Sequence, residues 1–250
     1  MNNKSIKGYI LTSKKDDIIL NSNIGDIIEK ERKPPFLVVN HEIYKIIVTR
    51  WPGKLFFVEV IDPVDNTKLK PGVKLRKDAH YTRAFAIKIL EELPVANLFG
   101  ENGEMISRIL DRISVFSKDE VLSLAKLENK EANELFSEGW NRWLKINDSN
   151  SIHHGYNHER VILIHTEKSC SPINYGLSII SSHYNQKIKE LIGDEAFYID
   201  EEGDECMQAQ WASALNVLFS IAMGYGASFL FNESELKVLT SAWEELFELR

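Results

Sequence analysis

The sequence predicts an α+β fold: a mainly antiparallel N-terminal sheet, a helical middle segment, and a C-terminal β-α-β-α-β-α unit with a small parallel sheet. Two observations support this prediction. Short apolar runs separated by turn residues occur from residue 8 to about residue 93, and helical periodicity and then strand–helix alternation follow. We therefore divide the chain into a basic antiparallel β-rich region (1–95), a helical segment (96–148) and an acidic α/β region (149–250), which could share one continuous core. The 250 residues, 44% of them hydrophobic, suffice for a sizeable core.

The N-terminal strands are predicted from runs rich in β-branched and aromatic residues, which suit a pleated surface. Between two of these runs stands Trp51-Pro52-Gly53, a sequence typical of a tight turn because proline presets φ and glycine accepts a positive φ. The runs on either side of this turn should form a hairpin. The predicted strands cover residues 8–12, 35–40, 44–50, 54–62 and 81–90.

Helical spacing begins in the middle segment. Residues 101–113 place apolar side chains three and four positions apart, which predicts an amphipathic helix. Ser117 is followed three residues later by Glu120, the spacing of a capping box that opens a second helix.

Helices are expected to continue to Leu144, with an interruption at Gly139, because glycine weakens a helix. Trp140 and Trp143 are three residues apart and would share one helix face. We interpret them as core anchors rather than as a ligand cage, because large aromatic rings dominate the packing of protein cores.

The C-terminal region alternates short apolar runs with helical patterns, which favours a parallel sheet with right-handed crossovers. One helix should begin at Ser171-Pro172, and the capping box formed by Asn232 and Glu235 should open the last helix. Strands are predicted at 160–166, 196–200 and 227–231, and a further helix at 205–223.

A candidate catalytic site follows from this parallel sheet, because ligands of open α/β sheets bind beyond the carboxyl ends of the strands. Cys170 stands just before a predicted helix, and the helix dipole, with Lys168 or a protonated His165 nearby, would lower its pKa and make it nucleophilic. The alternative is that Cys170 only fills space where loop meets helix. The candidates at the strand ends are His165, Glu167, Cys170 and Asp200.

Two clusters suggest metal binding. Imidazoles suit zinc or other transition metals, and carboxylates suit magnesium or calcium. The candidate ligands are His153, His154, His158 and Glu202. A polar connector and a solvated acidic turn before a helix explain the same residues without a metal. No motif indicates a cofactor, so none is expected.

A basic stretch covers residues 68–83. Its side chains could follow a phosphate backbone, and they could equally protect an edge strand from aggregation. The candidate phosphate-contacting residues are Lys68, Lys70, Lys74, Arg76, Lys77 and Arg83.

Charge is unevenly distributed along the chain. Residues 1–90 carry 17 Lys and Arg against 10 Asp and Glu, and residues 91–250 carry 13 against 27. This asymmetry indicates surfaces with different partners, or a basic sheet beside acidic helices. The longest apolar runs are too short for a membrane span, and the N-terminus lacks the apolar core of a secretory signal. We therefore expect a cytoplasmic protein with no membrane partner.

These observations favour a cytoplasmic, partner-binding accessory, immunity or regulatory protein without catalytic activity, because no catalytic motif outweighs a structural explanation. Another protein is the expected partner, and nucleic acid is possible through residues 68–83. The alternative is a hydrolase or transferase, with or without a metal, that has its site at the C-terminal strand ends. Its residues would be His165, Cys170, Asp200 and Glu202.

Overall fold

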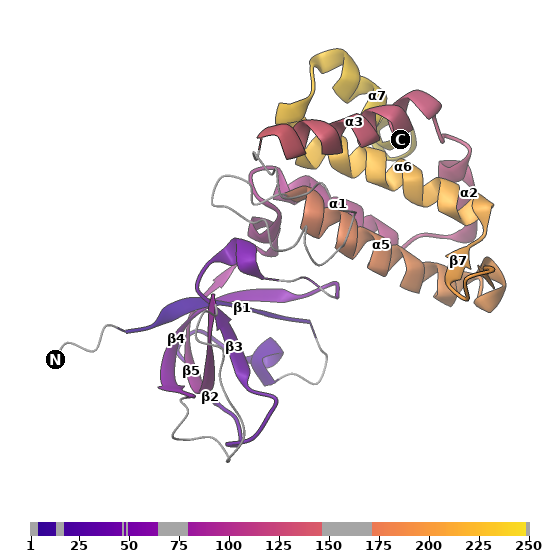
Figure 1. Cartoon of the computed structure of the whole chain (residues 1–250). Helices are drawn as coiled ribbons and strands as arrows, with labels where there is room; N and C mark the ends of the chain where they lie inside the picture. The colour runs from indigo at the N-terminus through magenta and orange to yellow at the C-terminus, as the bar shows by residue number, and fades with distance from the viewer. Residues whose placement is uncertain are drawn as a thin grey trace. The chain divides into compact units, whose positions relative to one another are not determined.

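The computed structural model describes residues 5–13, 18–46, 48, 50–64, 80–146 and 172–248. The chain divides into two compact units, residues 1–98 and residues 99–250. The first unit is built from strands and the second mainly from helices (Figure 1). Within the described residues, no helix is both long enough and apolar enough to cross a membrane.

A closed antiparallel barrel forms the first unit. The strands run in the order β2-β5-β3-β1-β4, and β4 pairs again with β5, which closes a ring of four strands. This confirms the antiparallel strands predicted near 8–12, 35–40, 54–62 and 81–90. The five strands are β1 (Lys7–Thr12), β2 (Ile27–Glu29), β3 (Leu37–Asn40), β4 (Lys54–Pro63) and β5 (Tyr81–Leu93).

The barrel core follows from side-chain alternation along the strands. In β1, alternate residues are buried, among them Ile10, while Tyr9 faces outward against Phe57 of β4 with the ring centroids 5.2 Å apart. Val39, Val58 and Ile87 meet Ile10 in the interior cluster. Irregular register between β4 and β5 marks bulges, which bend strands so that a sheet can close.

The hairpin predicted from residues 44–50 and 54–62 is wrong. Ile43–Lys45 form a 3-10 helix, and β4 pairs with β1 and β5 instead. The nonlocal partner β1 offers β4 six paired positions, from Lys7–Glu59 to Thr12–Lys54. Local turn chemistry at residues 51–53 therefore does not decide the pairing.

Six α-helices make up most of the described part of the second unit, and α6 is the central one among them. It packs against α1, α2, α3, α5 and α7, and Figure 1 shows it running through the helical unit. Buried residues occur around much of its circumference, as expected for a core helix. The helices are α1 (Gly103–Ser114), α2 (Lys118–Ala125), α3 (Lys130–Ile146), α5 (Pro172–Leu191), α6 (Ala209–Gly226) and α7 (Glu233–Trp243).

Local helix signals are confirmed. Ser117 and Glu120 form the capping box of α2, and Asn232 and Glu235 form that of α7. The predicted helix start at Pro172 is also observed.

Gly139 does not interrupt a helix, contrary to the prediction. α3 continues through it, and a Cβ at this position would lie 2.6 Å from Phe231 Cζ and 3.0 Å from Met223 Sδ. Glycine therefore serves close packing between α3 and the rest of the bundle. Trp143 is 1% exposed, which confirms it as a core anchor.

The predicted C-terminal parallel sheet is wrong. β6 (Phe197–Ile199) pairs antiparallel with β7 (Glu205–Met207), and these two strands form a separate two-stranded sheet. The segment from residue 205 is thus a strand before α6 begins at Ala209. Ser228–Leu230, predicted as a strand, form a 3-10 helix. The strand predicted at 160–166 lies outside the described residues.

Candidate functional site

Most residues proposed from the sequence as site residues lie outside the described part of the chain. This holds for three of the catalytic candidates, for the histidine cluster and for all but one of the basic residues. They are His165, Glu167, Cys170, His153, His154, His158, Lys68, Lys70, Lys74, Arg76 and Lys77.

Arg83 is the described member of the basic set. It lies on β5 of the barrel, where its guanidinium carbon is 5.4 Å from the centroid of the Tyr81 ring. Its Nη2 also donates a hydrogen bond of 3.2 Å to the Tyr81 hydroxyl. The structure therefore gives Arg83 a partner within its own strand.

Asp200 and Glu202 lie in the turn that joins β6 to β7. The Asp200 Oδ1 atom accepts backbone hydrogen bonds of 2.9 Å from Glu202 and Asp204. Gly203 adopts φ +89°, which a glycine tolerates best. These contacts lower the pKa of Asp200, with the Asp204 backbone bond as the largest cause. Asp200 thus fixes the turn in one conformation.

Cys206 faces Asp200 across this hairpin. Its thiol donates a hydrogen bond of 3.4 Å to Asp200 Oδ2. This bond to a carboxylate is the first cause of a raised pKa at Cys206. A thiol held in its protonated form is a poor nucleophile, so Cys206 has a structural position here.

Cys206 is therefore expected to react with iodoacetamide severalfold more slowly than free cysteine near neutral pH. The rate is measured in a Cys170→Ser background, so that one thiol contributes. Adding Asp200→Asn, which keeps an oxygen for the turn and removes the charge, should accelerate the reaction. Equal rates with and without the Asp200 carboxylate would contradict this account of Cys206.

The hairpin formed by β6 and β7 is anchored firmly at its base. The backbone N–H of Gln208 donates a hydrogen bond of 2.8 Å to the carbonyl of Ala196, and Ala196 is a fully buried residue. Lys189 of α5 reaches the hairpin from one side, with Nζ 2.6 Å from Glu205 Oε2 and 4.8 Å from the Phe197 ring centroid. The hairpin is thus a preorganised element of the helical unit.

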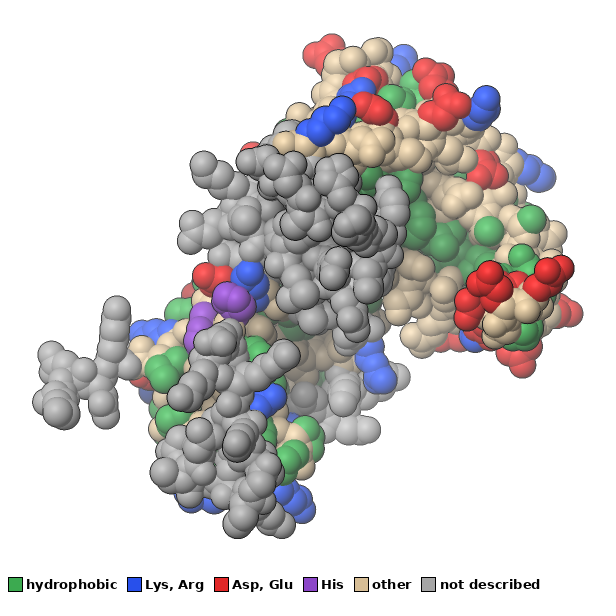
Figure 2. Space-filling view, viewed as in Figure 1, with side chains coloured by type: hydrophobic (Ala, Val, Ile, Leu, Met, Phe, Trp, Pro, Cys, Tyr) green, Lys and Arg blue, Asp and Glu red, His purple; other side chains and the backbone are tan. Residues whose placement is uncertain are grey.

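Two large apolar side chains are exposed on this anchored hairpin. Tyr198 is 49% exposed and Ile199 is 65% exposed. The turn beside them carries Asp200, Glu201, Glu202 and Asp204, and Figure 2 shows acidic side chains gathered over this end of the helical unit. Exposed apolar groups rimmed by charge on a rigid element are typical of a protein-contact surface.

Tyr198 and Ile199 are not among the site residues predicted from the sequence, because residues 196–200 are predicted as a short strand of a parallel sheet. A signal for the hairpin was present. Apolar residues 197–199 precede a turn that contains Gly203, and residues 205–207 follow it, which is the pattern of a hairpin with a longer loop.

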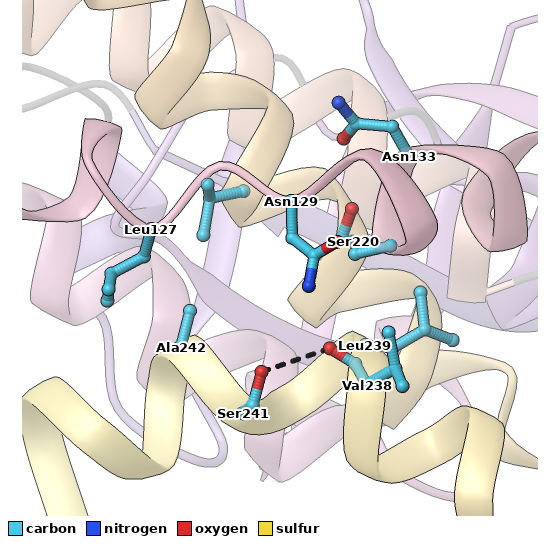
Figure 3. A pocket seen from close by; sticks show the side chains of 10 residues that line it. Leu127, Asn129, Asn133, Ser220, Val238, Leu239, Ser241 and Ala242 are labelled. Carbon is cyan, nitrogen blue, oxygen red and sulfur yellow. Dashed lines mark hydrogen bonds between the residues drawn. The ribbon is translucent and has the colours of Figure 1, made fainter.

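A small pocket lies between the turn before α3, α6 and α7 (Figure 3). It encloses about 240 Å³ including the part open to solvent, and Asn129, Asn133 and Ser241 contribute polar groups. The buried Ser220 hydroxyl, 3% exposed, has no hydrogen-bond partner among the described residues. The free space suits about one water molecule, so this pocket is not a site for a larger ligand.

Ser220→Ala is expected to leave the free energy of unfolding nearly unchanged, because no described residue forms a hydrogen bond with the Ser220 hydroxyl. Ser114→Ala is the matched control, since the Ser114 hydroxyl lies 2.9 Å from His183 Nε2 and 3.2 Å from the Leu110 carbonyl. That control should lose about 1 kcal/mol. Urea unfolding compares the two variants, and equal losses in both would contradict the assignment.

The described residues contain no group of three or more His, Cys, Asp or Glu side chains placed to hold a metal ion. A comparison of the chain with protein-family models, with curated proteins and with solved structures found no match.

Proposed function

We propose that the chain is a cytoplasmic accessory, immunity or regulatory factor that acts by binding another protein, and that the β6–β7 hairpin is the contact element. The observation that carries the proposal is the exposure of Tyr198 and Ile199 on an element whose backbone is fixed at both ends. A preorganised element loses little conformational entropy when it binds.

The hairpin has the chemistry of a binding hot spot. Tyrosine supplies a large contact area with few rotatable bonds and is enriched at the centres of interfaces. Ile199 adds apolar area beside it, and the exposed carboxylates of the turn would steer a basic partner toward the hairpin. Asp200, for its part, is engaged in holding the turn.

The hydrolase or transferase alternative required parallel strands that end at one edge of a sheet. Because β6 and β7 pair antiparallel, Asp200 and Glu202 lie in a hairpin turn and not at an edge where parallel strands end. We therefore propose a binding function only.

The test compares three tagged forms of the full chain in extracts of its native cell. The wild type should recover a stoichiometric partner, and the double variant Tyr198→Ser, Ile199→Ser should lose it. The matched control is Val115→Ser, Phe229→Ser, which removes two apolar side chains of the same unit that are 63% and 65% exposed. Retention of the partner by the hairpin variant, or equal loss in both variants, would refute the proposal.

A further inference from the structure

We infer that the partner of this hairpin presents an extended, basic segment that adds to β6 as a third strand. The inference rests on the proposed function, since it names the chemistry of the partner at the same site. It is carried by the backbone edge of β6, by the apolar side chains on that edge, and by the charge of the adjoining turn.

The backbone of β6 has an open edge. Asp200 N donates to Asp204 O at 3.0 Å, and Gln208 N donates to Ala196 O at 2.8 Å, so the even-numbered residues of the hairpin face across the ladder. In an antiparallel pair the intervening residues direct their N–H and C=O groups outward. In β6 these are Ile199, with both its N–H and C=O, and Phe197, whose C=O faces outward while its N–H already donates to the Asp194 carbonyl. No further strand among the described residues lies beside β6.

The edge of β6 lacks the usual protection against pairing. Natural edge strands are often shielded by charged side chains or proline. β6 carries Phe197, Tyr198 and Ile199, and the last two are exposed. β7, by contrast, begins with Glu205, which pairs with Lys189. An incoming strand would therefore find the Ile199 N–H as a backbone donor, the carbonyls of Phe197 and Ile199 as acceptors, and apolar side chains together on β6.

The charge around the hairpin selects a basic segment. Residues 190–205 include eight Asp and Glu and no Lys or Arg. Glu201, Glu202 and Asp204 are exposed at the turn, next to the end of β6. Lysine or arginine side chains at one end of an added strand would meet these carboxylates, whereas an acidic strand would be repelled.

The experiment uses the full chain labelled with nitrogen-15 and a capped peptide of alternating lysine and valine. The peptide should bind with amide shifts centred on Ile199, whose N–H faces outward. Replacing lysine with glutamate should weaken binding about tenfold or more, because it removes the attraction to the acidic turn. N-methylation of every second peptide bond should weaken binding as much, because it removes backbone hydrogen bonds of the added strand. Equal affinity of the N-methylated peptide would overturn strand addition.

A variant pair tests the edge itself. Ile199→Pro removes an outward N–H without removing a ladder bond, and Met207→Pro makes the same change on the outer edge of β7. The first should weaken the lysine–valine peptide about tenfold and the second should leave binding unchanged, with thermal unfolding used to verify that both fold. Equal effects, or no binding of the peptide at millimolar concentration, would overturn the inference.

The two proposals fail separately. If partner recovery depends on Tyr198 and Ile199 while the basic peptide does not bind, the hairpin is a docking element and strand addition is wrong. If partner recovery does not depend on these residues, the proposed function itself is wrong.

Discussion

Replacing Arg142 with methionine is expected to lower the free energy of unfolding of the helical unit by about 2–3 kcal/mol. Arg142 of α3 donates to both carboxylate oxygens of Glu235, at 2.8 and 2.9 Å, and to the Leu230 carbonyl at 2.9 Å. Glu235 is also the acidic member of the α7 capping box. Removing the guanidinium therefore weakens a helix start as well as a contact between helices.

The Arg142 prediction is measured by urea unfolding followed by tryptophan fluorescence, because four of the five tryptophans lie in residues 99–250. Arg142→Lys should lose less, since it keeps the charge and loses only the two-pronged geometry. Lys130→Met is the control: Lys130, on the same helix as Arg142, is 91% exposed in its ion pair with Glu134, and such pairs contribute about 0–1 kcal/mol. Equal losses from Arg142→Met and Lys130→Met would contradict the role of this network.

The same ion pair predicts a dependence on pH. The bond from Arg142 is the first cause that lowers the pKa of Glu235 from 4.5 to about 2. Between these values the unfolded chain binds a proton that the folded chain does not, so this stabilisation is present above pH 4.5 and is lost as the pH falls toward 2. The stability difference between wild type and Arg142→Met should shrink over that interval, and a constant difference would contradict the assignment.

Gly224→Val is expected to lower the free energy of unfolding by about 3 kcal/mol, at the upper end of overpacking effects. A Cβ on Gly224 of α6 would lie 2.9 Å from Leu239 Cβ and 3.0 Å from Thr240 Cγ2, both on α7. The Leu239 Cβ atom is bonded directly to the α7 backbone, so it cannot move away unless α7 itself shifts. Gly224→Ala should cost less, because alanine also favours the helix.

The control for Gly224→Val is Gln210→Val, which introduces the same β-branched residue at an exposed position of α6. It should cost only about 0.5 kcal/mol, the difference in helix propensity. Thermal or urea unfolding measures both variants. A similar cost at the two positions would show that helix propensity, rather than close contact between α6 and α7, determines the effect.

Local chemistry was the predictable part of this fold. The side chains of Ser117 and Asn232 satisfy backbone donors within one helical turn, so the capping boxes were visible in the sequence and are present in the structure. The strand at 8–12 is likewise predicted from its composition and is present as β1, in which alternate residues are buried. These signals depend on neighbours a few residues away.

Pairing between distant segments was the unpredictable part. Residues 227–231 are a short apolar run, and periodicity alone does not tell whether such a run forms a strand or a buried helical segment. In the structure Ala227 N donates a hydrogen bond of 3.0 Å to Met223 O, so the chain passes from α6 directly into a 3-10 helix, in which Leu230 is buried. The residues of this run do not themselves indicate that they pack against helices.

The candidate site was missed for the same reason. The acidic run at 200–205 was interpreted as a turn before a helix, because negative charge is favourable there. Its Asp200 instead closes a hairpin whose second strand, Glu205–Met207, was assigned to that helix. With the second strand assigned to that helix, residues 196–200, which include Tyr198 and Ile199, are predicted as a short strand of a parallel sheet instead of the first strand of a hairpin.

The most direct test of the hairpin as a docking element is hydrogen exchange of the full chain, alone and saturated with the partner that it recovers. Binding through the hairpin predicts slower exchange at the amide of Ile199, the N–H of β6 that faces outward. Unchanged exchange throughout residues 197–207, with protection only elsewhere, would contradict the account.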